Sequence, residues 1–257
     1  MSCPRFSVVT VCYNHARYLE SCIQSVLAQN YPNLEYIIID GGSTDGSVEI
    51  IRKYADHLAY WVSEPDKGQT DALIKGFRRA TGELEGWLNS DDMLSPGTLH
   101  EVANFFEHNP PAQVVTGDVE LLHADGSRWR VQRQLPFMRF LWLNDHNYIG
   151  QSSTFWRREL YERVGGLDAS FNLAMDGDLF GRFADVTRLY KVSNIWSRFR
   201  VYDQQKTLRL SEEAAAETLR IRRRYYPSET KLGFHLRRSA ARPLRLLLKL
   251  VMGCYRT

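Results

Sequence analysis

Cysteine is scarce in this sequence of 257 residues, and the four cysteines show no CxxC spacing. Structural zinc sites and disulfide frameworks both need several cysteines at close, regular intervals. The sequence therefore gives no support to either class of protein, and it favours a reducing, cytoplasmic setting.

Long hydrophobic runs are also missing. No stretch reaches the roughly 18 apolar residues that a membrane-spanning helix requires, and the opening MSCPRFSVVTVCYN lacks the basic region and apolar core of a signal peptide. We therefore expect the chain to stay on the cytoplasmic side of the membrane.

The net charge is small, at +3, and by itself it gives no reason to expect nucleic-acid binding. Low-complexity segments and fixed-period repeats are absent as well. Hydrophobic residues make up 44% of the chain and charged residues 25%, which is ordinary for a globular protein. We predict one domain over residues 1–210 and a basic helical extension over 211–257.

Apolar strand-like runs alternate with helical patterns through the first half of the chain. We predict strands at 6–12, 34–40, 58–64, 83–89 and 112–121. Helices are predicted at 16–29, from the GGSTDGS turn through residue 55, and at 70–80. A further helix is expected to open at Ser95-Pro96, with proline in its first turn. This order predicts an α/β fold with a mostly parallel sheet and right-handed crossovers.

Carboxylates follow two of the predicted strands directly. Asp40 ends one strand, and the adjacent pair Asp91 and Asp92 ends another. Ligands of parallel α/β sheets bind outside the carboxyl ends of the strands, so these side chains are expected around one crevice. Two like charges side by side are costly unless a cation neutralises them. The alternative is that all three residues cap turns.

After residue 120 the pattern loosens. Asp125-Gly126 predicts a hairpin, and the aromatic-rich stretch that begins at Met138 is expected mainly to pack, although such side chains also suit sugar or lipid contacts. Asp176 and Asp178 lie near the start of a further predicted helix.

Five segments in collinear order resemble the family 2 glycosyltransferases, nucleotide-diphospho-sugar transferases of the GT-A fold. They are SVVTVCYNHARYLESCIQSVLAQNYPNLEYIIIDGGSTDGS, SEPDKGQTDALIKG, LNSDDML, GQSSTFWRREL and AMDGDLFGRF. The resemblance covers roughly residues 6–207. It implies a Rossmann-like sheet whose nucleotide-sugar half spans about 1–120 and whose acceptor half spans about 121–210.

The resemblance assigns the nucleotide side of the site. The residues that it implies there are Thr10, Tyr13, Asn14, Asp40, Lys67, Asp71 and Asp91. A carboxylate such as Asp40 accepts a hydrogen bond from the imide N–H of uracil, which favours a UDP or dTDP donor. Asp91 is expected on the ribose. For Lys67, an exposed surface charge is an equal alternative.

A divalent cation is the implied cofactor, because it stabilises the diphosphate that leaves as the sugar bond breaks. Manganese or magnesium prefers oxygen ligands and needs few from the protein. By resemblance to the family's DxD-like motif, Asp92 is the expected ligand.

Inverting transfer needs one base to deprotonate the acceptor hydroxyl. Asp176 stands at the family's position for it, with Asp178 as the second candidate, whose alternative role is to pair with Arg182. Gln151 and Trp156 are expected on the acceptor or donor-sugar side.

The sequence departs from the family at Met175, where a glutamate is usual, and at Tyr202, where a histidine often stands. Tyrosine is a poor ligand for these cations, so Asp203, or phosphate oxygens and water, would complete the shell. The group expected on the diphosphate side consists of Arg200, Tyr202, Gln205 and Lys206.

The chain from Arg220 onward is strongly basic, and Glu229 is its single acid. Leucines interleaved with Arg245 and Lys249 predict an interfacial helix attracted to anionic lipids, which would place the protein peripherally at the inner face of the membrane. The alternative is a helix that packs on the sheet or in a dimer.

These features together predict a metal-dependent, inverting glycosyltransferase that acts on a lipid-linked saccharide in cell-surface polysaccharide synthesis. Transfer to polyprenyl phosphate, which needs no base, remains an alternative, as does a non-catalytic docking protein that binds a nucleotide sugar. A glycoside hydrolase would not need the strand-end aspartate pair. A nucleotidyltransferase is disfavoured because no glycine-rich phosphate loop follows the first strand.

Overall fold

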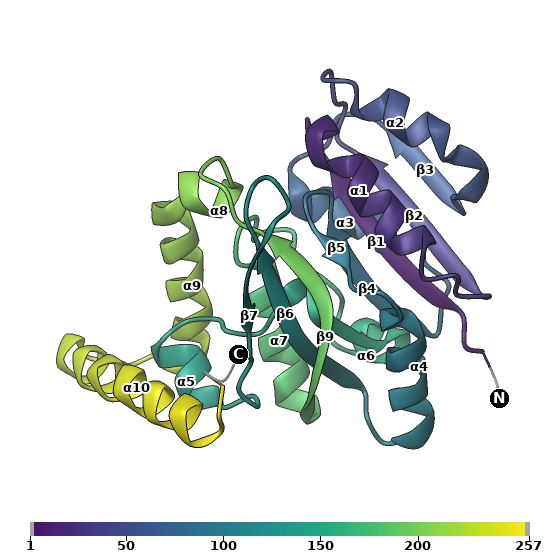
Figure 1. Cartoon of the computed structure of the whole chain (residues 1–257). Helices are drawn as coiled ribbons and strands as arrows, with labels where there is room; N and C mark the ends of the chain where they lie inside the picture. Colours follow the sequence, from purple (N-terminus) through teal and green to yellow (C-terminus); the bar gives the residue numbers. More distant parts are fainter. Residues whose placement is uncertain (1–2, 255–257) are drawn as a thin grey trace.

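The computed structural model describes residues 3–254. One continuous sheet runs through it in the order β3-β2-β1-β4-β8-β6-β9-β5, with β7 paired to β6 (Figure 1). The strands are β1 (Phe6–Cys12), β2 (Leu34–Asp40), β3 (Tyr60–Ser63), β4 (Leu84–Asn89), β5 (Met93–Leu94), β6 (Val114–Leu122), β7 (Arg128–Gln132), β8 (Thr154–Arg157) and β9 (Leu189–Arg200).

The first four long strands are parallel. In register, Cys12 of β1 lies beside Asp40 of β2, and Val11 lies beside Asn89 of β4. All seven residues of β1 are buried, which is typical of a strand covered on both faces. The carboxyl ends of β1, β2 and β4 consequently open onto one edge, as the sequence predicts.

The second half of the sheet is mixed. β8 is antiparallel to both β4 and β6, whereas β6 and β9 are parallel. The two predicted halves thus share one sheet, joined through β8. The hairpin at Asp125-Gly126 is confirmed, with Gly126 at φ 88° in its turn. β7 pairs with a strand on one side only within the described residues, and its first three residues are exposed.

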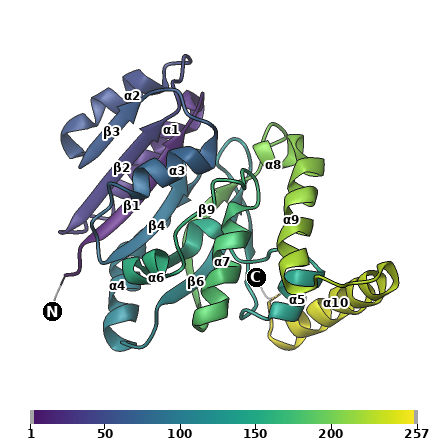
Figure 2. The same ribbon diagram turned by 180° about the vertical axis from the view of Figure 1, so that it is seen from behind.

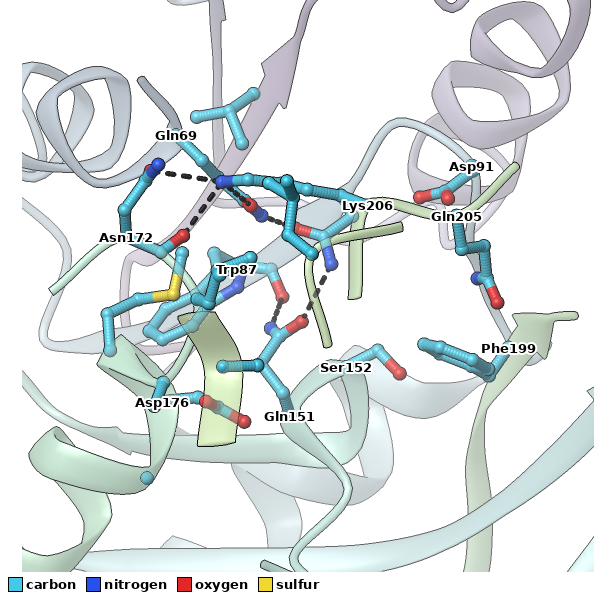
Figure 3. A pocket seen from close by; sticks show the side chains of 18 of the residues that line it. Gln69, Trp87, Asp91, Gln151, Ser152, Asn172, Asp176, Phe199, Gln205 and Lys206 are labelled. Carbon is cyan, nitrogen blue, oxygen red and sulfur yellow. Dashed lines mark hydrogen bonds between the residues drawn. The ribbon is translucent and has the colours of Figure 1, made fainter. Parts of the chain in front are cut away.

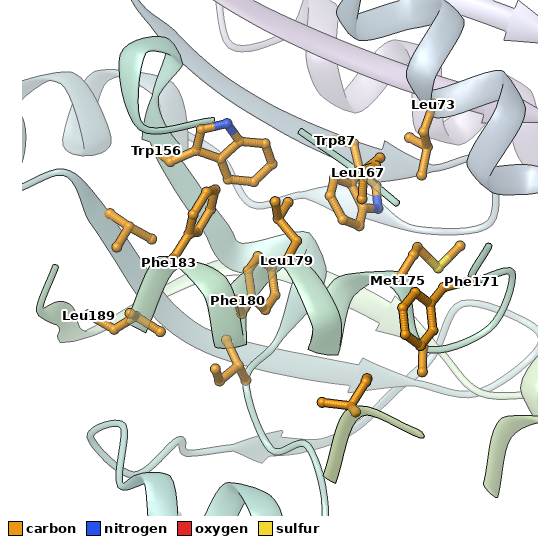
Figure 4. Close-up of a cluster of buried hydrophobic side chains, with 14 of the residues drawn as sticks. Leu73, Trp87, Trp156, Leu167, Phe171, Met175, Leu179, Phe180, Phe183 and Leu189 are labelled. Carbon is orange, nitrogen blue, oxygen red and sulfur yellow. The ribbon is translucent and has the colours of Figure 1, made fainter. Parts of the chain in front are cut away.

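Helices cover both faces of the sheet (Figures 1 and 2). One core lies under α1 (Ala16–Leu27), α2 (Ser47–Lys53) and α4 (Thr98–His108). The other lies under α3 (Gln69–Phe77), α6 (Arg158–Arg163) and α7 (Met175–Val186). Figure 4 shows the second core, in which Trp87, Trp156 and Phe180 pack together.

The polypeptide after β9 is helical. It comprises α8 (Lys206–Arg209), α9 (Ser211–Tyr225) and α10 (Lys231–Val251), and α10 packs beside α5 (Arg139–Asn144). In Figure 1, α10 projects from the body of the molecule. The extension therefore packs in part, because Leu244, Leu248 and the ion pair of Arg245 with Asp145 join it to the core.

One boundary differs from the sequence prediction. The helix expected to open at Ser95-Pro96 begins at Thr98 instead, preceded by Gly97 at φ 78°. Pro96 lies outside the helix because Ser95 is engaged elsewhere: its N–H donates to the carbonyl of Trp196 and continues the β5–β9 pairing.

Candidate active site

A cavity of about 1080 Å³ opens at the carboxyl ends of β1, β2 and β4. One end is lined by residues that follow the parallel strands, among them Tyr13, Gly41 and Asp66. The other end lies between the mixed part of the sheet and the helices α5, α7 and α9. A cleft of this size at this edge is where α/β sheets bind ligands.

The two adjacent aspartates have different surroundings. Asp91 lines the cavity, and its Oδ2 accepts a 2.9 Å hydrogen bond from the Tyr202 hydroxyl. Asp92 is fully buried and does not line the cavity; its Oδ1 accepts from the backbone N–H of Arg200, while its Oδ2 has no hydrogen-bond partner among the described residues. Burial, and then the neighbouring Asp91 charge, raise the pKa of Asp92 well above its usual range.

This arrangement explains how the chain tolerates the pair. The buried carboxyl of Asp92 therefore favours its neutral form, and Asp91 is the member of the pair that lines the cavity. Asp92 is the ligand expected from the sequence, but of the two side chains only Asp91 lines the cavity.

Tyr202 and Arg200 support Asp91 from β9 and the segment after it. Burial and the Asp91 charge raise the pKa of Tyr202, which therefore remains a hydrogen-bond donor. The Arg200 guanidinium donates to the carbonyls of Asp91 and Ala124 and lies over the ring of Tyr18. Arg200 is buried, and its hydrogen bonds hold the segment that contains Asp91. These contacts do not place its guanidinium at the expected position beside the diphosphate.

Asp176 lies in the first turn of α7 and lines the cavity. Its Oδ2 accepts a 3.0 Å hydrogen bond from the Asn147 side chain (Figure 3 shows Asp176 at the edge of the pocket). Burial raises the pKa of Asp176 to about 6, against the opposing effect of its hydrogen bonds. A carboxylate with a pKa near 6 is ionised at neutral pH and basic enough to accept a proton.

A chain of amide hydrogen bonds runs along the wall of the cavity (Figure 3). Gln69 donates to Asn89, Asn89 donates to Gln151, and Gln151 donates to the carbonyl of Trp87. This network fixes Gln151, an expected site residue, and Asn89, whose importance no sequence pattern indicated.

Lys206 is the cationic side chain of this network. Its Nζ donates to the carbonyl and side-chain oxygens of Asn172 and to Gln69. Burial lowers the pKa of Lys206. These hydrogen-bond partners are neutral oxygens, so its positive charge can also attract an anion in the cavity.

Glu217 of α9 holds the segment that leads into α7. Its carboxylate accepts from the backbone N–H groups of Asn172, Leu173 and Ala174, at 2.8 to 3.2 Å. The loop that precedes Asp176 is thereby tied to α9. Sequence patterns did not single out Glu217, because its partners are backbone groups far along the chain.

Residues 7–165 match the family described as Glycosyl transferase family 2. An uncharacterised glycosyltransferase of Mycobacterium tuberculosis is 32% identical over 187 residues, which cover 71% of this chain and 70% of that protein. A PGL/p-HBAD biosynthesis glycosyltransferase of Mycobacterium bovis is 30% identical over 200 residues, covering 75% and 76%. The chain belongs to glycosyl transferase family 2.

Solved structures share the fold of this glycosyltransferase. A fragment of S. aureus TarS in complex with UDP-GlcNAc superposes with a TM-score of 0.68 at 16% identity, over 92% of this chain and 71% of the fragment. The longer TarS chain is covered to 41%. The mannosyltransferase PcManGT of Pyrobaculum calidifontis, in complex with GDP-Man and Mn²⁺, gives 0.63 at 21% identity, over 91% and 69%. The GT-A expectation for the fold is confirmed.

Of the residues expected on the nucleotide side of the glycosyltransferase, Tyr13 and Asp91 line the cavity, and the others do not. Thr10 is buried and bonded to the Tyr36 hydroxyl. Asn14 is exposed and accepts from the backbone of Thr44.

Asp40 is fully buried beneath the cavity. Its carboxylate accepts from the N–H groups of Gly42 and Ser43 and from the hydroxyls of Ser43 and Ser63. These contacts are those of the turn cap that the sequence also allowed. In this structure its oxygens are engaged by the turn and do not reach the cavity, so the assignment to uracil finds no geometric support.

Asp71 and Lys67 form a local pair outside the cavity lining. The Asp71 carboxylate accepts from the backbone N–H of Lys67 and pairs with Lys75, and these contacts, the backbone hydrogen bond above all, lower its pKa. The Lys67 side chain is exposed, as the alternative interpretation anticipated.

Trp156, expected on the acceptor or donor-sugar side, and Asp178, the second candidate for the base, do not line the cavity. Trp156 is fully buried in the core (Figure 4). Its Nε1 donates a hydrogen bond to Glu85. Asp178 is buried between Arg182 and Arg224 and pairs with both. Of the acceptor and diphosphate groups, Gln151, Tyr202, Gln205 and Lys206 line the cavity, and so does Asp176, the expected base.

Proposed function

We propose that this glycosyltransferase moves a sugar, with inversion, from a UDP- or dTDP-linked donor to a hydroxyl of a lipid-linked saccharide in cell-surface polysaccharide synthesis. The observation that carries the proposal is the placement of Asp91 and Asp176 in one cavity, at the carboxyl ends of the parallel strands. Family membership supplies the reaction class. The UDP-GlcNAc complex of TarS, a protein of the same fold, supports the choice of a uridine donor.

A manganese or magnesium ion fits the donor set. Asp91 offers a carboxylate to the cavity, and no cluster of three or more His, Cys, Asp or Glu side chains suited to a metal occurs among residues 3–254. The protein would thus supply one carboxylate, and the diphosphate and water the remaining oxygen ligands. PcManGT, which has the same fold, was solved with Mn²⁺. When bound, the cation would stabilise the leaving diphosphate as a Lewis acid.

Three side chains of the cavity have separate roles in the proposed reaction. Tyr202 orients the Asp91 carboxylate through its hydroxyl. Lys206 directs a positive charge at the diphosphate and is held in place by Asn172 and Gln69. Asp176 removes the proton from the accepting hydroxyl, and Asn147 fixes the orientation of its carboxylate.

The exposed face of α10 supports attachment to an anionic membrane surface. Leu232, Leu236, Leu247 and Leu250 recur at helical spacing and are 57 to 69% exposed. Lys231, Arg238 and Arg242 flank this stripe and are also exposed. An apolar stripe beside cations is typical of interfacial helices. No helix in the described part of the chain has the length and apolarity to cross a membrane. We therefore place the enzyme peripherally at the cytoplasmic leaflet.

The test is release of nucleoside diphosphate from a panel of nucleotide sugars, with Mn²⁺ and a bacterial lipid extract. One or two donors should be turned over. Asp91→Asn should lower kcat/KM by about 100-fold, because it weakens binding of the cation that stabilises the leaving group. Asp56→Asn, an exposed aspartate remote from the cavity, is the matched control and should retain activity. Full activity of Asp91→Asn would reject the assignment.

A further inference from the structure

The half of the cavity around Asp176 is an apolar chamber. Its floor is formed by alternate residues of two neighbouring strands, Val119 and Leu121 of β6 and Phe199 of β9. Alternate residues of a strand face the same side, so these side chains form one surface. Sugars are polar, so these apolar side chains have no counterpart in the hydroxyl groups of a saccharide.

The roof of the chamber is one face of α9. Ala214, Thr218 and Ile221 of α9 line the cavity, as does Leu210 directly before the helix, and spacings of four, four and three residues place them on one side. Ile221 lies directly beside the base: its Cδ1 is 3.6 Å from the position that a Cβ on Gly177, the residue after Asp176, would occupy. The apolar surface therefore begins next to the reacting group.

One polar side chain is built into this chamber without a partner. Gln134 is 2% exposed and lines the cavity, yet both its Oε1 and its Nε2 lack hydrogen-bond partners among the described residues. Its backbone N–H donates to Asp118, which holds the residue in place. A buried amide with neither donor nor acceptor satisfied is costly, and a ligand that supplies both would remove the cost.

The segment from Asn147 to Gln151 places Gln134 in the same site as the base. Asn147 bonds to Asp176, Gln151 belongs to the amide network, and a Cβ on Gly150 would lie 3.3 Å from the Gln134 Nε2. Asp176 and Gln134 thus both lie against the short segment from Asn147 to Gln151.

Resting on the proposed function, we propose that the chamber binds an acceptor whose apolar aglycone lies directly next to the accepting sugar, and that Gln134 binds a hydroxyl of that sugar. The acceptor is accordingly a short glycolipid or an alkyl or aryl glycoside. In a long oligosaccharide, by contrast, the apolar group would lie far from the reacting hydroxyl, and the apolar surface beside Asp176 would be left facing sugar.

Equilibrium binding tests this inference without requiring turnover. Calorimetry would compare octyl and methyl glycosides of common hexoses, below the micelle concentration of the octyl compound. We expect the octyl glycoside to bind at least about tenfold more tightly, since several methylene groups leave water. Ala214→Trp should abolish that difference by filling the chamber. Equal binding of the two glycosides would overturn the proposal.

Gln134→Leu tests the polar contact. It should weaken binding of both glycosides by about tenfold, since it removes a buried donor and acceptor. Gln113→Leu is the matched control, because Gln113 also carries an unpaired buried amide oxygen but does not line the cavity. Unchanged binding in Gln134→Leu would overturn its assignment.

Two further measurements separate the chamber from other sites. Octyl glycoside that remains bound to Ala214→Trp but is lost from Leu247→Asn would locate binding on α10 and contradict the chamber. Binding of nucleoside diphosphate, measured on the same variants, should not change. If the unmodified protein did not bind nucleoside diphosphate, the proposed function would be contradicted. The comparison of octyl and methyl glycosides would still show whether the chamber binds an apolar aglycone.

Discussion

At the scale of single residues, the site depends on how burial divides the acidic side chains. Asp91, Asp92 and Asp176 are of one residue type, yet Asp91 lines the cavity, Asp92 is buried with a raised pKa, and Asp176 has a pKa raised to about 6. Environment sets these differences, since burial penalises the charged form and hydrogen bonds to the carboxylate favour it.

The pKa of about 6 for Asp176 gives a pH prediction. A general base must be unprotonated, so kcat for transfer to a hydroxyl should fall as pH drops through about 6 and should level off above it. Asn147→Ala removes a hydrogen bond that lowers this pKa, so the acidic limb should move to higher pH. Asp176→Asn should lose 10²- to 10⁴-fold in kcat while nucleotide binding persists.

The measurement is a pH–rate profile with saturating donor, alongside nucleotide binding by calorimetry at each pH. A profile without an acidic limb, or Asp176→Asn with full transfer, would contradict the role of Asp176. The second result, obtained with a lipid phosphate as acceptor, would favour transfer to polyprenyl phosphate, which needs no base.

At the scale of elements, α10 combines two surfaces. Leu244 and Leu248 pack against the core, whereas Leu236 and Leu247 face outward. The sequence left packing and membrane contact as alternatives, and the structure shows that packing uses one face of the helix and leaves the other free for a second surface.

Vesicle sedimentation tests the outward face. Leu236→Asn combined with Leu247→Asn should greatly reduce binding to vesicles rich in phosphatidylglycerol, and added salt should weaken binding of the unmodified protein because cations contribute. Leu219→Asn, at an exposed leucine of α9, is the control and should bind normally. Equal binding to neutral phosphatidylcholine vesicles, or full binding by the double variant, would refute attachment to an anionic surface.

Local patterns predicted the elements well and the site unevenly, for a physical reason. The strand over 6–12 and the helix near Asp176 follow from residue periodicity, which acts over a few neighbours. The placement of Trp156 and Arg200 depends on partners distant in sequence, Glu85 and the Asp91 loop, which no local pattern specifies. Gln134 and Glu217 could not be predicted as site residues for the same reason, since an isolated polar residue forms no recognisable motif.

At the scale of the whole molecule, Trp156 links the two halves of the sheet. It lies on β8, which pairs with both β4 and β6, and its ring contacts Phe77, Trp87 and Phe183. Trp156→Ala should lower the free energy of unfolding by about 3–5 kcal/mol through loss of buried surface and creation of a cavity. It should also deprive the buried Glu85 carboxylate of its hydrogen bond.

Urea denaturation would measure this change, with Trp156→Phe as the comparison that retains an aromatic ring. We expect Trp156→Phe to be the milder substitution. A loss below about 1 kcal/mol for Trp156→Ala would be far smaller than core truncations cost and would show that Trp156 does not join the halves.

The free edge of β7 has a consequence for how copies of this protein behave at high local concentration. An unpaired strand edge is a template for pairing with another chain. Here Arg128 and Arg130 stand on that strand, and Arg128 is drawn to Glu120 of its own sheet. Two such edges would bring arginines against arginines. We therefore expect copies that meet at these edges to repel one another and not to pair into an extended sheet.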